Sequence, residues 1–418
     1  MAAPSSSSSI TFPPSNTAVR VRLVDTTAVM TVRAESFVKP TQPGHELLNL
    51  TCAAFLIEHP SSSPGSGPDR IMFDLGVRTD YWNYAAVLQA RIGSVIPSLR
   101  VDKGVPEILV KRGVGLDSIS SVIWSHFHWD HIGDMSLFPP STEVVVGPGF
   151  KSSPLLLPGY PDHPGSPVLA SDFAGRELRE IDFASASGST LQIGNYRAFD
   201  FFGDGSFYLL ADNPCPTLRQ TDTPGHCLGH MCGLARTTAG DDDSTFLLLG
   251  GDICHFVGDL RPNPTHPIPD PVPGDVLDND PSYFPTPCPC SLFTEHHPAI
   301  SQGDRGDPTR TPFYKVSTHP MSAYVDPPTA QASVDKLLHF EQSPAVMVCL
   351  AHDAALLKYL PTFNREPEAD LNGWKAKGWK ERCRWDWLNE MPRNGRPGRK
   401  PIVQGFWRDG KPWDRKVD

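Results

Sequence analysis

The sequence predicts a layered α/β fold, in which buried strands alternate with helices and long irregular connections. Seven apolar runs are rich in Val, Ile, Leu and Phe and are bounded by Gly, Pro or Asp, a pattern typical of buried strands. These runs cover residues 50–59, 70–76, 121–126, 142–147, 205–210, 244–252 and 345–353. Two stretches with helical character lie between them, at 105–114 and 329–342. Strands interleaved with helices favour helical layers packed on sheets.

Composition and charge narrow the classes of partner. The chain of 418 residues has a net charge of −10 at pH 7, which argues against nucleic acid because a phosphate backbone requires a basic surface. No apolar run approaches the roughly 20 residues of a membrane-spanning helix, and the first residues, MAAPSSSSSITFPPSN, lack the features of a signal peptide. The nine cysteines are scattered, which indicates free thiols rather than a disulfide framework. We therefore expect a cytoplasmic protein that binds neither nucleic acid nor membranes.

The chain divides into a main unit with a flanking segment at each end. We expect residues 1–16 to be disordered, residues 17–365 to form the main domain, and residues 366–418 to form an extension. A stretch at 258–298 is rich in Pro, Asp and His without a regular pattern, which is typical of a lid, a binding loop or a disordered insert. From Leu371 onward the chain is basic and rich in Trp. Such a stretch can bind nucleic acid or membranes, but more often it is an added helix whose tryptophans pack on the domain.

Histidines and aspartates gather at the ends of the predicted strands. The segment HFHWDHIGD at 126–134 has three His and two Asp within nine positions, directly after an apolar run. Other strand ends or the loops between them supply Asp74, His226, His230, Asp252 and His352. Because functional groups gather at the carboxyl ends of strands in α/β sheets, these side chains should meet. Imidazole and carboxylate suit Zn²⁺, with Fe or Mn as alternatives, and there are enough of them for two ions that share a carboxylate.

The order of these motifs resembles the metallo-β-lactamase superfamily. His-x-His-x-Asp-His after a strand is followed by TPGHCLGH, GGD and AHD, so the resemblance covers most of residues 45–355. Within that superfamily the motifs are most similar to those of the bacterial N-acyl homoserine lactonases, which share an opening like PGHELLNLTCAAFLI and a strand ending in Asp-x-Gly. The proline-rich sequence with its inserts is similar to fungal members of the superfamily. The resemblance implies a four-layer αββα sandwich, to which the Pro-rich insert and the C-terminal extension are additions.

The resemblance also implies roles for individual residues. One metal ion would be held by His126, His128 and His226 and the other by Asp130, His131 and His352, with Asp252 bridging both. Asp74 would orient a ligand histidine through its free ring nitrogen, and His230 would support the site. The lactonases have a tyrosine three residues after the bridging aspartate, where this chain has His255. This departure leaves the substrate class open and makes His255 a candidate for contact with the substrate carbonyl.

The implied chemistry is hydrolysis of an ester or amide bond by two zinc ions. A metal-bridging hydroxide would attack the carbonyl, a metal helped by His255 would stabilise the oxyanion, and Asp130 or a metal-bound water would protonate the leaving group. We therefore expect a hydrolase that opens a small-molecule lactone or lactam.

Several alternatives to this function stay open. One is a thioesterase that releases acyl or polyketide chains from a carrier protein, and another is a nucleic-acid processing nuclease, which the negative charge disfavours. A mononuclear iron dioxygenase is a further alternative, because ligand type alone does not select the metal. The oligomeric state does not follow from the sequence. Specificity should depend on the loops at 77–104, 148–190 and 258–298, and the stretch ADNPCPTLRQT at 211–221 is interpreted as an insertion near the site.

Overall fold

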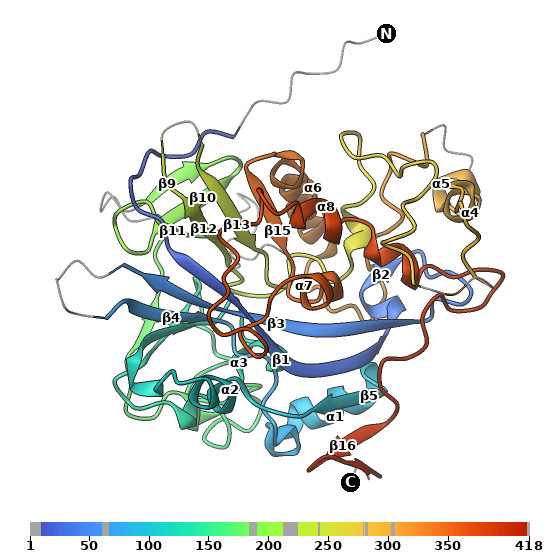
Figure 1. The fold of residues 1–418 in the computed structure, drawn as a ribbon. Helices are drawn as coiled ribbons and strands as arrows, with labels where there is room; N and C mark the ends of the chain where they lie inside the picture. The colour runs from blue at the N-terminus through green and yellow to red at the C-terminus, as the bar shows by residue number, and fades with distance from the viewer. Residues whose placement is uncertain are drawn as a thin grey trace.

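Two large sheets face each other in the computed structural model (Figure 1). The structure describes residues 10–60, 67–183, 190–211, 225–240, 243–278, 280, 283–301 and 306–415. The first sheet has the strand order β17 (Lys411–Trp413), β16 (Phe406–Arg408), β5 (Ser98–Val101), β1 (Arg20–Arg33), β3 (Leu47–His59), β4 (Asp69–Phe73), β6 (Ile119–Ile123), β7 (Glu143–Val146) and β8 (Leu178–Glu180). The second has the order β15 (Val346–Cys349), β13 (Thr245–Leu249), β12 (Cys232–Thr238), β11 (Phe207–Ala211), β10 (Tyr196–Asp200) and β9 (Thr190–Ile193). A short pair joins β2 (Val38–Lys39) to β14 (Lys315–Val316).

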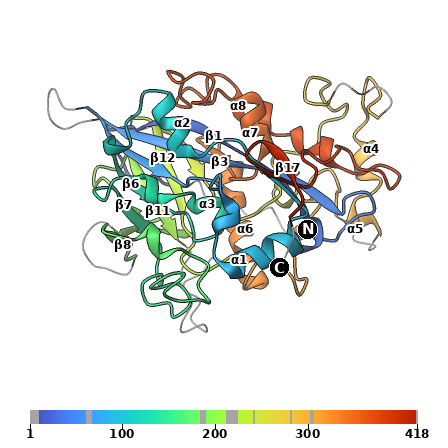
Figure 2. The same ribbon diagram turned by 90° about the horizontal axis from the view of Figure 1, so that it is seen from below.

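Helices cover the outer faces of both sheets, which confirms the predicted four-layer αββα sandwich (Figures 1 and 2). The core between the sheets joins Phe55 and Phe73 of the first sheet to Phe207 and Leu247 of the second. The first sheet is covered by α1 (Ala86–Val95) and α2 (Val105–Lys111), and the second by α6 (Pro327–Gln342). The remaining helices are short: α3 (Trp129–Ile132), α4 (Ser291–Thr294), α5 (Pro298–Ser301), α7 (Ala354–Tyr359) and α8 (Trp379–Cys383).

The direction of the strands determines where the site forms. Strands β4, β6, β7 and β8 are parallel to one another, and β13 is parallel to β15 in the other sheet. The carboxyl ends of β4 and β6 therefore lie at one edge of the sandwich, and those of β13 and β15 lie together across the gap. Side chains that follow these strands meet where the two edges face each other, in the loops that carry function in α/β folds.

Each predicted strand and both predicted helices are present, but the longest strand of the first sheet was not predicted. Strand β1 has a bulge between Asp25 and Val29, and Thr27 within it has a positive φ of 58°. The polar run Asp25–Thr27 at this bulge interrupts the apolar pattern by which a buried strand is recognised.

The two ends of the chain correct the prediction for the flanking segments. Residues 1–9 lie outside the described part, but residues 10–16 are packed rather than disordered, since the ring of Phe12 stacks on Phe246 at 4.1 Å. The C-terminal extension is more than an added helix. It contains α8 and the hairpin β16–β17, and β16 pairs in parallel with β5, so the extension enlarges the first sheet. Trp374 and Trp387 are buried, as expected for tryptophans that pack on the domain.

The Pro-rich stretch at 258–298 is ordered wherever the structure describes it. Its side chains Val272, Tyr283 and Phe293 are buried in the main core, which excludes the disordered alternative for the described residues. Most of the predicted insertion at 211–221 falls at 212–224, outside the described residues. Among the described helices, none combines the length and the apolar character that crossing a membrane requires.

Candidate metal centre

The predicted histidines and aspartates converge at the facing edges of the two sheets. After β6 the chain runs through His126 and His128 into α3, and the loops after β13 and β15 deliver Asp252 and His352. Two groups of four residues form, within each of which the candidate ligand atoms lie no more than 4.8 Å apart: His126, His128, His226 and Cys227 in one, and Asp130, His131, Asp252 and His352 in the other. A third group, of His226, Asp252 and His255, overlaps both. Burial raises the pKa of the Cys227 thiol well above its ordinary value.

The carboxylate of Asp252 lies between the two groups. Its Oδ1 is 2.9 Å from His131 Nε2 and 3.1 Å from His352 Nε2. Its Oδ2 is 3.5 Å from the Nε2 atoms of both His126 and His226. One oxygen therefore faces each group, which is the arrangement that a carboxylate shared by two cations requires.

A glycine allows Asp252 to reach this position. Gly251 has a φ of +51°, and a Cβ atom there would lie 2.9 Å from His230 Nε2 and 3.0 Å from Ser125 Cβ. Only glycine fits at this point without displacing both neighbours. His230 in turn accepts a hydrogen bond at Nε2 from the backbone N–H of Asp252 at 3.0 Å. His230 therefore supports the aspartate from behind, and burial lowers its pKa to about 3.

The donor atoms of the site fit divalent cations. His131 Nε2, His352 Nε2 and Asp252 Oδ1 are buried and lack a hydrogen bond within the described chain, although they lie close together. Burial of polar atoms without a hydrogen-bond partner costs free energy unless a cation occupies the space between them.

The electrostatics of the two groups also favour cations. In the first group, burial lowers the pKa of His126 and His226 well below the ordinary value, and that of His128 to about 3. The imidazoles are therefore neutral, yet His226 Nε2 lies 3.2 Å from His126 Nε2 and 2.9 Å from His128 Nδ1. In the second group, burial lowers the pKa of His131, but the carboxylates of Asp252, Asp74 and Asp130 together outweigh burial and raise this pKa well above the ordinary value. A metal ion would replace that proton as the positive charge beside the carboxylate.

A set of hydrogen bonds behind the ligands fixes which ring atom faces the centre. The Nδ1–H of His131 donates to Asp74 Oδ2 at 2.8 Å, and the Nδ1–H of His352 donates to the carbonyl oxygen of Thr51 at 2.8 Å. Asp74 therefore lies where the sequence predicts it. Ser125, which was not predicted from the sequence, donates its hydroxyl to the same Asp74 oxygen at 2.8 Å. With Nδ1 anchored, Nε2 of both histidines points inward.

His255 lies beside the Asp252 carboxylate on the cavity side. Its Nε2 is 3.0 Å from Asp252 Oδ2, and its Nδ1 is 2.9 Å from the hydroxyl of Tyr324. Tyr324 was not predicted, and the sequence carries no signal for it, because it is one tyrosine in an irregular segment remote from every motif.

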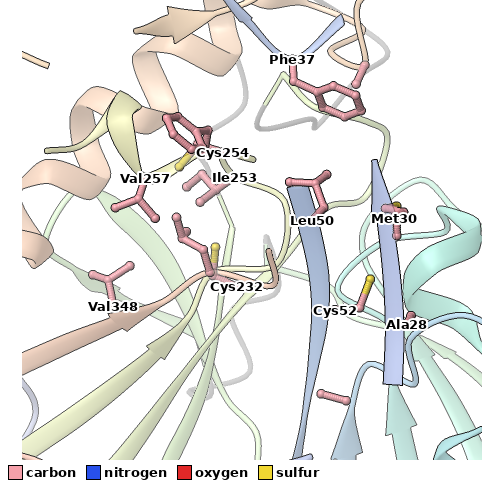
Figure 3. Packing of buried hydrophobic residues seen from close by; sticks show 14 of the residues in the cluster. Ala28, Met30, Phe37, Leu50, Cys52, Cys232, Ile253, Cys254, Val257 and Val348 are labelled. Atoms are coloured by element: carbon pink, nitrogen blue, oxygen red, sulfur yellow. The ribbon is translucent and has the colours of Figure 1, made fainter. Parts of the chain in front are cut away.

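An apolar cavity of about 370 Å³ opens onto the centre. Asp130, Asp252, His255 and His352 form its polar end, and Phe127 and Trp129 from the histidine motif also line it. Its walls are apolar side chains of β1, β3, α1 and the segment between β1 and β2: Met30, Val32, Phe37, Leu50, Leu88 and Val95. Figure 3 shows Met30, Phe37 and Leu50 among these buried residues. Arg91 is the one Lys or Arg among the described residues that line the cavity. A cavity of this size and polarity suits a small organic molecule.

A sandwich of this topology, with a histidine–aspartate centre at its sheet edges, defines a class of metal-dependent hydrolases. The chain belongs to the metallo-β-lactamase superfamily, whose sequence profile matches residues 66–352. It is 39% identical over 383 residues to the gamma-lactamase FDB1 of Fusarium pseudograminearum, a match that covers 91% of this chain and 84% of that protein. It is 41% identical over 268 residues to the gamma-lactamase MBL2 of Gibberella moniliformis, covering 64% of this chain and all of that protein (100%).

Solved structures are more distant. A crystal structure of a B. thuringiensis AiiA mutant with N-decanoyl-L-homoserine bound at its active site has a TM-score of 0.47 and 16% identity, and the match covers 83% of this chain and 98% of that one.

Proposed function

We propose that this hydrolase opens a small lactam, or the corresponding lactone, with the help of two divalent metal ions. The proposal rests on the position of the Asp252 carboxylate. One of its oxygens faces each of two groups of candidate ligand atoms, at the polar end of an apolar cavity. The two relatives at 39% and 41% identity are named gamma-lactamases, which favours a cyclic amide over a lactone.

Two zinc ions are the cations that best suit the donor set of imidazoles and carboxylates. One would be held by His126, His128 and His226, the other by Asp130, His131 and His352, and both by Asp252. When bound, the ions would supply an activated water as the nucleophile and polarise the substrate carbonyl. Iron or manganese would accept a similar donor set, so metal analysis is part of the test.

Two residues of the chain would act directly on the substrate. His255 lines the cavity with Nε2 on the side of Asp252, where a donor can reach the oxygen that becomes negative during ring opening. Asp130 also lines the cavity, and its Oδ2 is 3.6 Å from His352 Nε2. A ring nitrogen must gain a proton before it can leave as an amine, and Asp130 would accept the proton that the attacking water loses and pass it to that nitrogen.

The cavity limits which substrates fit. Its walls are apolar, so a substrate with an apolar or aromatic body gains from burial there, whereas a charged body does not. Arg91 supplies a positive charge among the lining residues and suits the carboxylate that ring opening produces.

The test combines metal analysis with a panel of substrates. The purified protein is analysed for metal and incubated with γ-lactams, γ-lactones, acyl thioesters and single-stranded RNA. We expect two zinc ions per chain and opening of an apolar γ-lactam, and Asp252→Ala should lose both metal and activity. Turnover of thioesters or RNA alone, or one iron per chain with oxygen uptake, would contradict the proposal.

A further inference from the structure

A buried tyrosine lies behind His255. Tyr324 is 3% exposed, and its hydroxyl is 2.9 Å from His255 Nδ1. Its ring packs edge-on against His255, with a centroid distance of 5.2 Å, and against His226, with a centroid distance of 5.5 Å. Tyr324 therefore contacts one candidate metal ligand and the histidine that lines the cavity, while it does not line the cavity itself.

The backbone holds Tyr324 in this place. The N–H groups of Val325 and Asp326 donate to the carbonyl oxygens of His226 and Gly225 at 3.0 and 2.9 Å. Gly225 has a φ of +86°, and a Cβ atom there would lie 2.0 Å from the backbone nitrogen of Ala330 in α6. The segment that carries Tyr324 is thus locked to the loop that carries His226, and the phenol has little freedom to leave His255.

The two neighbours of His255 select one tautomer of its ring. Its Nε2 lies 3.0 Å from a carboxylate oxygen of Asp252, which can only accept a hydrogen bond. A proton on Nε2 satisfies that contact and leaves Nδ1 as an acceptor for the Tyr324 hydroxyl. In the opposite tautomer, with the proton on Nδ1, the lone pair of Nε2 would face a lone pair of the Asp252 carboxylate. The buried hydroxyl hydrogen of the phenol would then have no acceptor at Nδ1. Both contacts therefore favour the Nε2–H form.

We propose that Tyr324 is a positioning residue that keeps His255 in the Nε2–H tautomer, so that the single Nε2–H hydrogen, which faces Asp252 Oδ2, can be shared with the substrate carbonyl oxygen. The inference rests on the proposed function for its kinetic consequence, but the tautomer itself does not depend on the substrate. No bond to Tyr324 forms or breaks during the reaction. A tyrosine from a distant segment, combined with a histidine, here supplies the hydrogen-bond donor beside the metal centre.

The test compares Tyr324→Phe with a matched control. Tyr314 forms the same kind of pair away from the cavity, since its buried hydroxyl is 2.6 Å from His45 Nδ1. Zinc-loaded protein with ¹⁵N-labelled histidine gives the tautomer from the ring nitrogen shifts, and the His255 signals are assigned by their loss in His255→Ala. We expect an unprotonated Nδ1 and a protonated Nε2 on His255 in the wild type and in Tyr314→Phe, and averaged shifts in Tyr324→Phe.

Kinetics on the best lactam of the panel provide the second readout. Tyr324→Phe should lower kcat by about 10–100-fold, as for other groups that orient a reacting histidine, with an unchanged metal content and KM within about twofold. Added to His255→Ala, it should cost nothing further, because the two residues act as one unit. Tyr314→Phe should leave kcat unchanged.

The two proposals fail in different ways. A wild type that opens no substrate of the panel contradicts the proposed function, while the nitrogen shifts still decide the tautomer. An active wild type whose Tyr324→Phe variant keeps both the His255 tautomer and kcat overturns the role of Tyr324. Independent reductions of kcat by Tyr324→Phe and His255→Ala would overturn that role as well.

Discussion

Replacing Asp74 by alanine should destabilise the protein even when no metal is present. Asp74 is 2% exposed and accepts three hydrogen bonds: from the backbone N–H of Ser125 at 2.7 Å, from the Ser125 hydroxyl at 2.8 Å and from His131 Nδ1 at 2.8 Å. It also has a φ of 62°, a region that aspartate tolerates better than alanine. The residue therefore ties the end of β4 to the end of β6 and to α3.

The expected loss follows from these contacts. Hydrogen bonds to a charged group contribute about 1.5–3 kcal/mol each, and donors left buried without a partner cost a similar amount. The three bonds share one carboxylate and are not additive, so we expect a loss of about 4 kcal/mol in the free energy of unfolding. Asp69, at the other end of β4, is a matched control, since it accepts one exposed hydrogen bond from Ser120 at 2.7 Å. Asp69→Ala should cost less than about 1 kcal/mol.

The assay is urea unfolding in the presence of a chelator, so that metal loss does not contribute to the difference. Metal content of the untreated proteins is measured in parallel, and Asp74→Ala should bind less metal because the His131 ring is no longer oriented. If Asp74→Ala unfolded within about 1 kcal/mol of the wild type, the hydrogen bonds to Asp74 would not be what stabilises this part of the site.

Three further predictions concern pH, the C-terminal extension and the cavity. Burial raises the pKa of Asp172 from 3.8 to about 7. The folded chain therefore retains a proton that the unfolded chain releases, so the wild type should lose about 3 kcal/mol between pH 4 and pH 7 relative to Asp172→Asn in urea unfolding. Arg399 donates to the buried Asp386 at 2.9 and 3.0 Å, so Arg399→Ala should lower the free energy of unfolding by about 3 kcal/mol, and an unchanged midpoint would show that this ion pair within the extension does not stabilise the fold. Val87 is 40% exposed and lines the cavity, so Val87→Trp should raise KM about tenfold with unchanged metal content, unlike Val110→Trp on the exposed side of α2.

The convergence of the candidate ligands could be predicted because each of them follows an apolar run or lies in a motif around one. Val122 and Ile123 identify β6, and the rule that functional groups gather at strand ends places His126 near Asp252 without knowledge of the sheet order. The supporting residues carry no such signal. Ser125 is a common residue type, and Tyr324 lies 69 positions after His255 in a segment without periodicity. The backbone pairing of Val325 and Asp326 with the loop of His226 brings Tyr324 to the site.

The fold, like the site, could be predicted only in part from the sequence. Strands with uniform apolar runs, such as β13, are visible in the sequence, whereas the bulge at Asp25–Val29 hides β1. The hairpin β16–β17 consists of two three-residue strands, too short for any periodicity, and its attachment to β5 depends on a long-range pairing of Phe406 with Leu99. Pairings of this kind depend on the whole assembled sheet and cannot be read from a local pattern.

We propose that two metal ions share the Asp252 carboxylate. A crystal structure of the zinc-loaded protein, with anomalous diffraction recorded on both sides of the zinc edge, tests it most directly. We predict two zinc peaks per chain, one near Asp252 Oδ2 within reach of His126, His128 and His226, and one near Oδ1 within reach of Asp130, His131 and His352. A single peak, or a second peak that Asp252 does not contact, would contradict this claim.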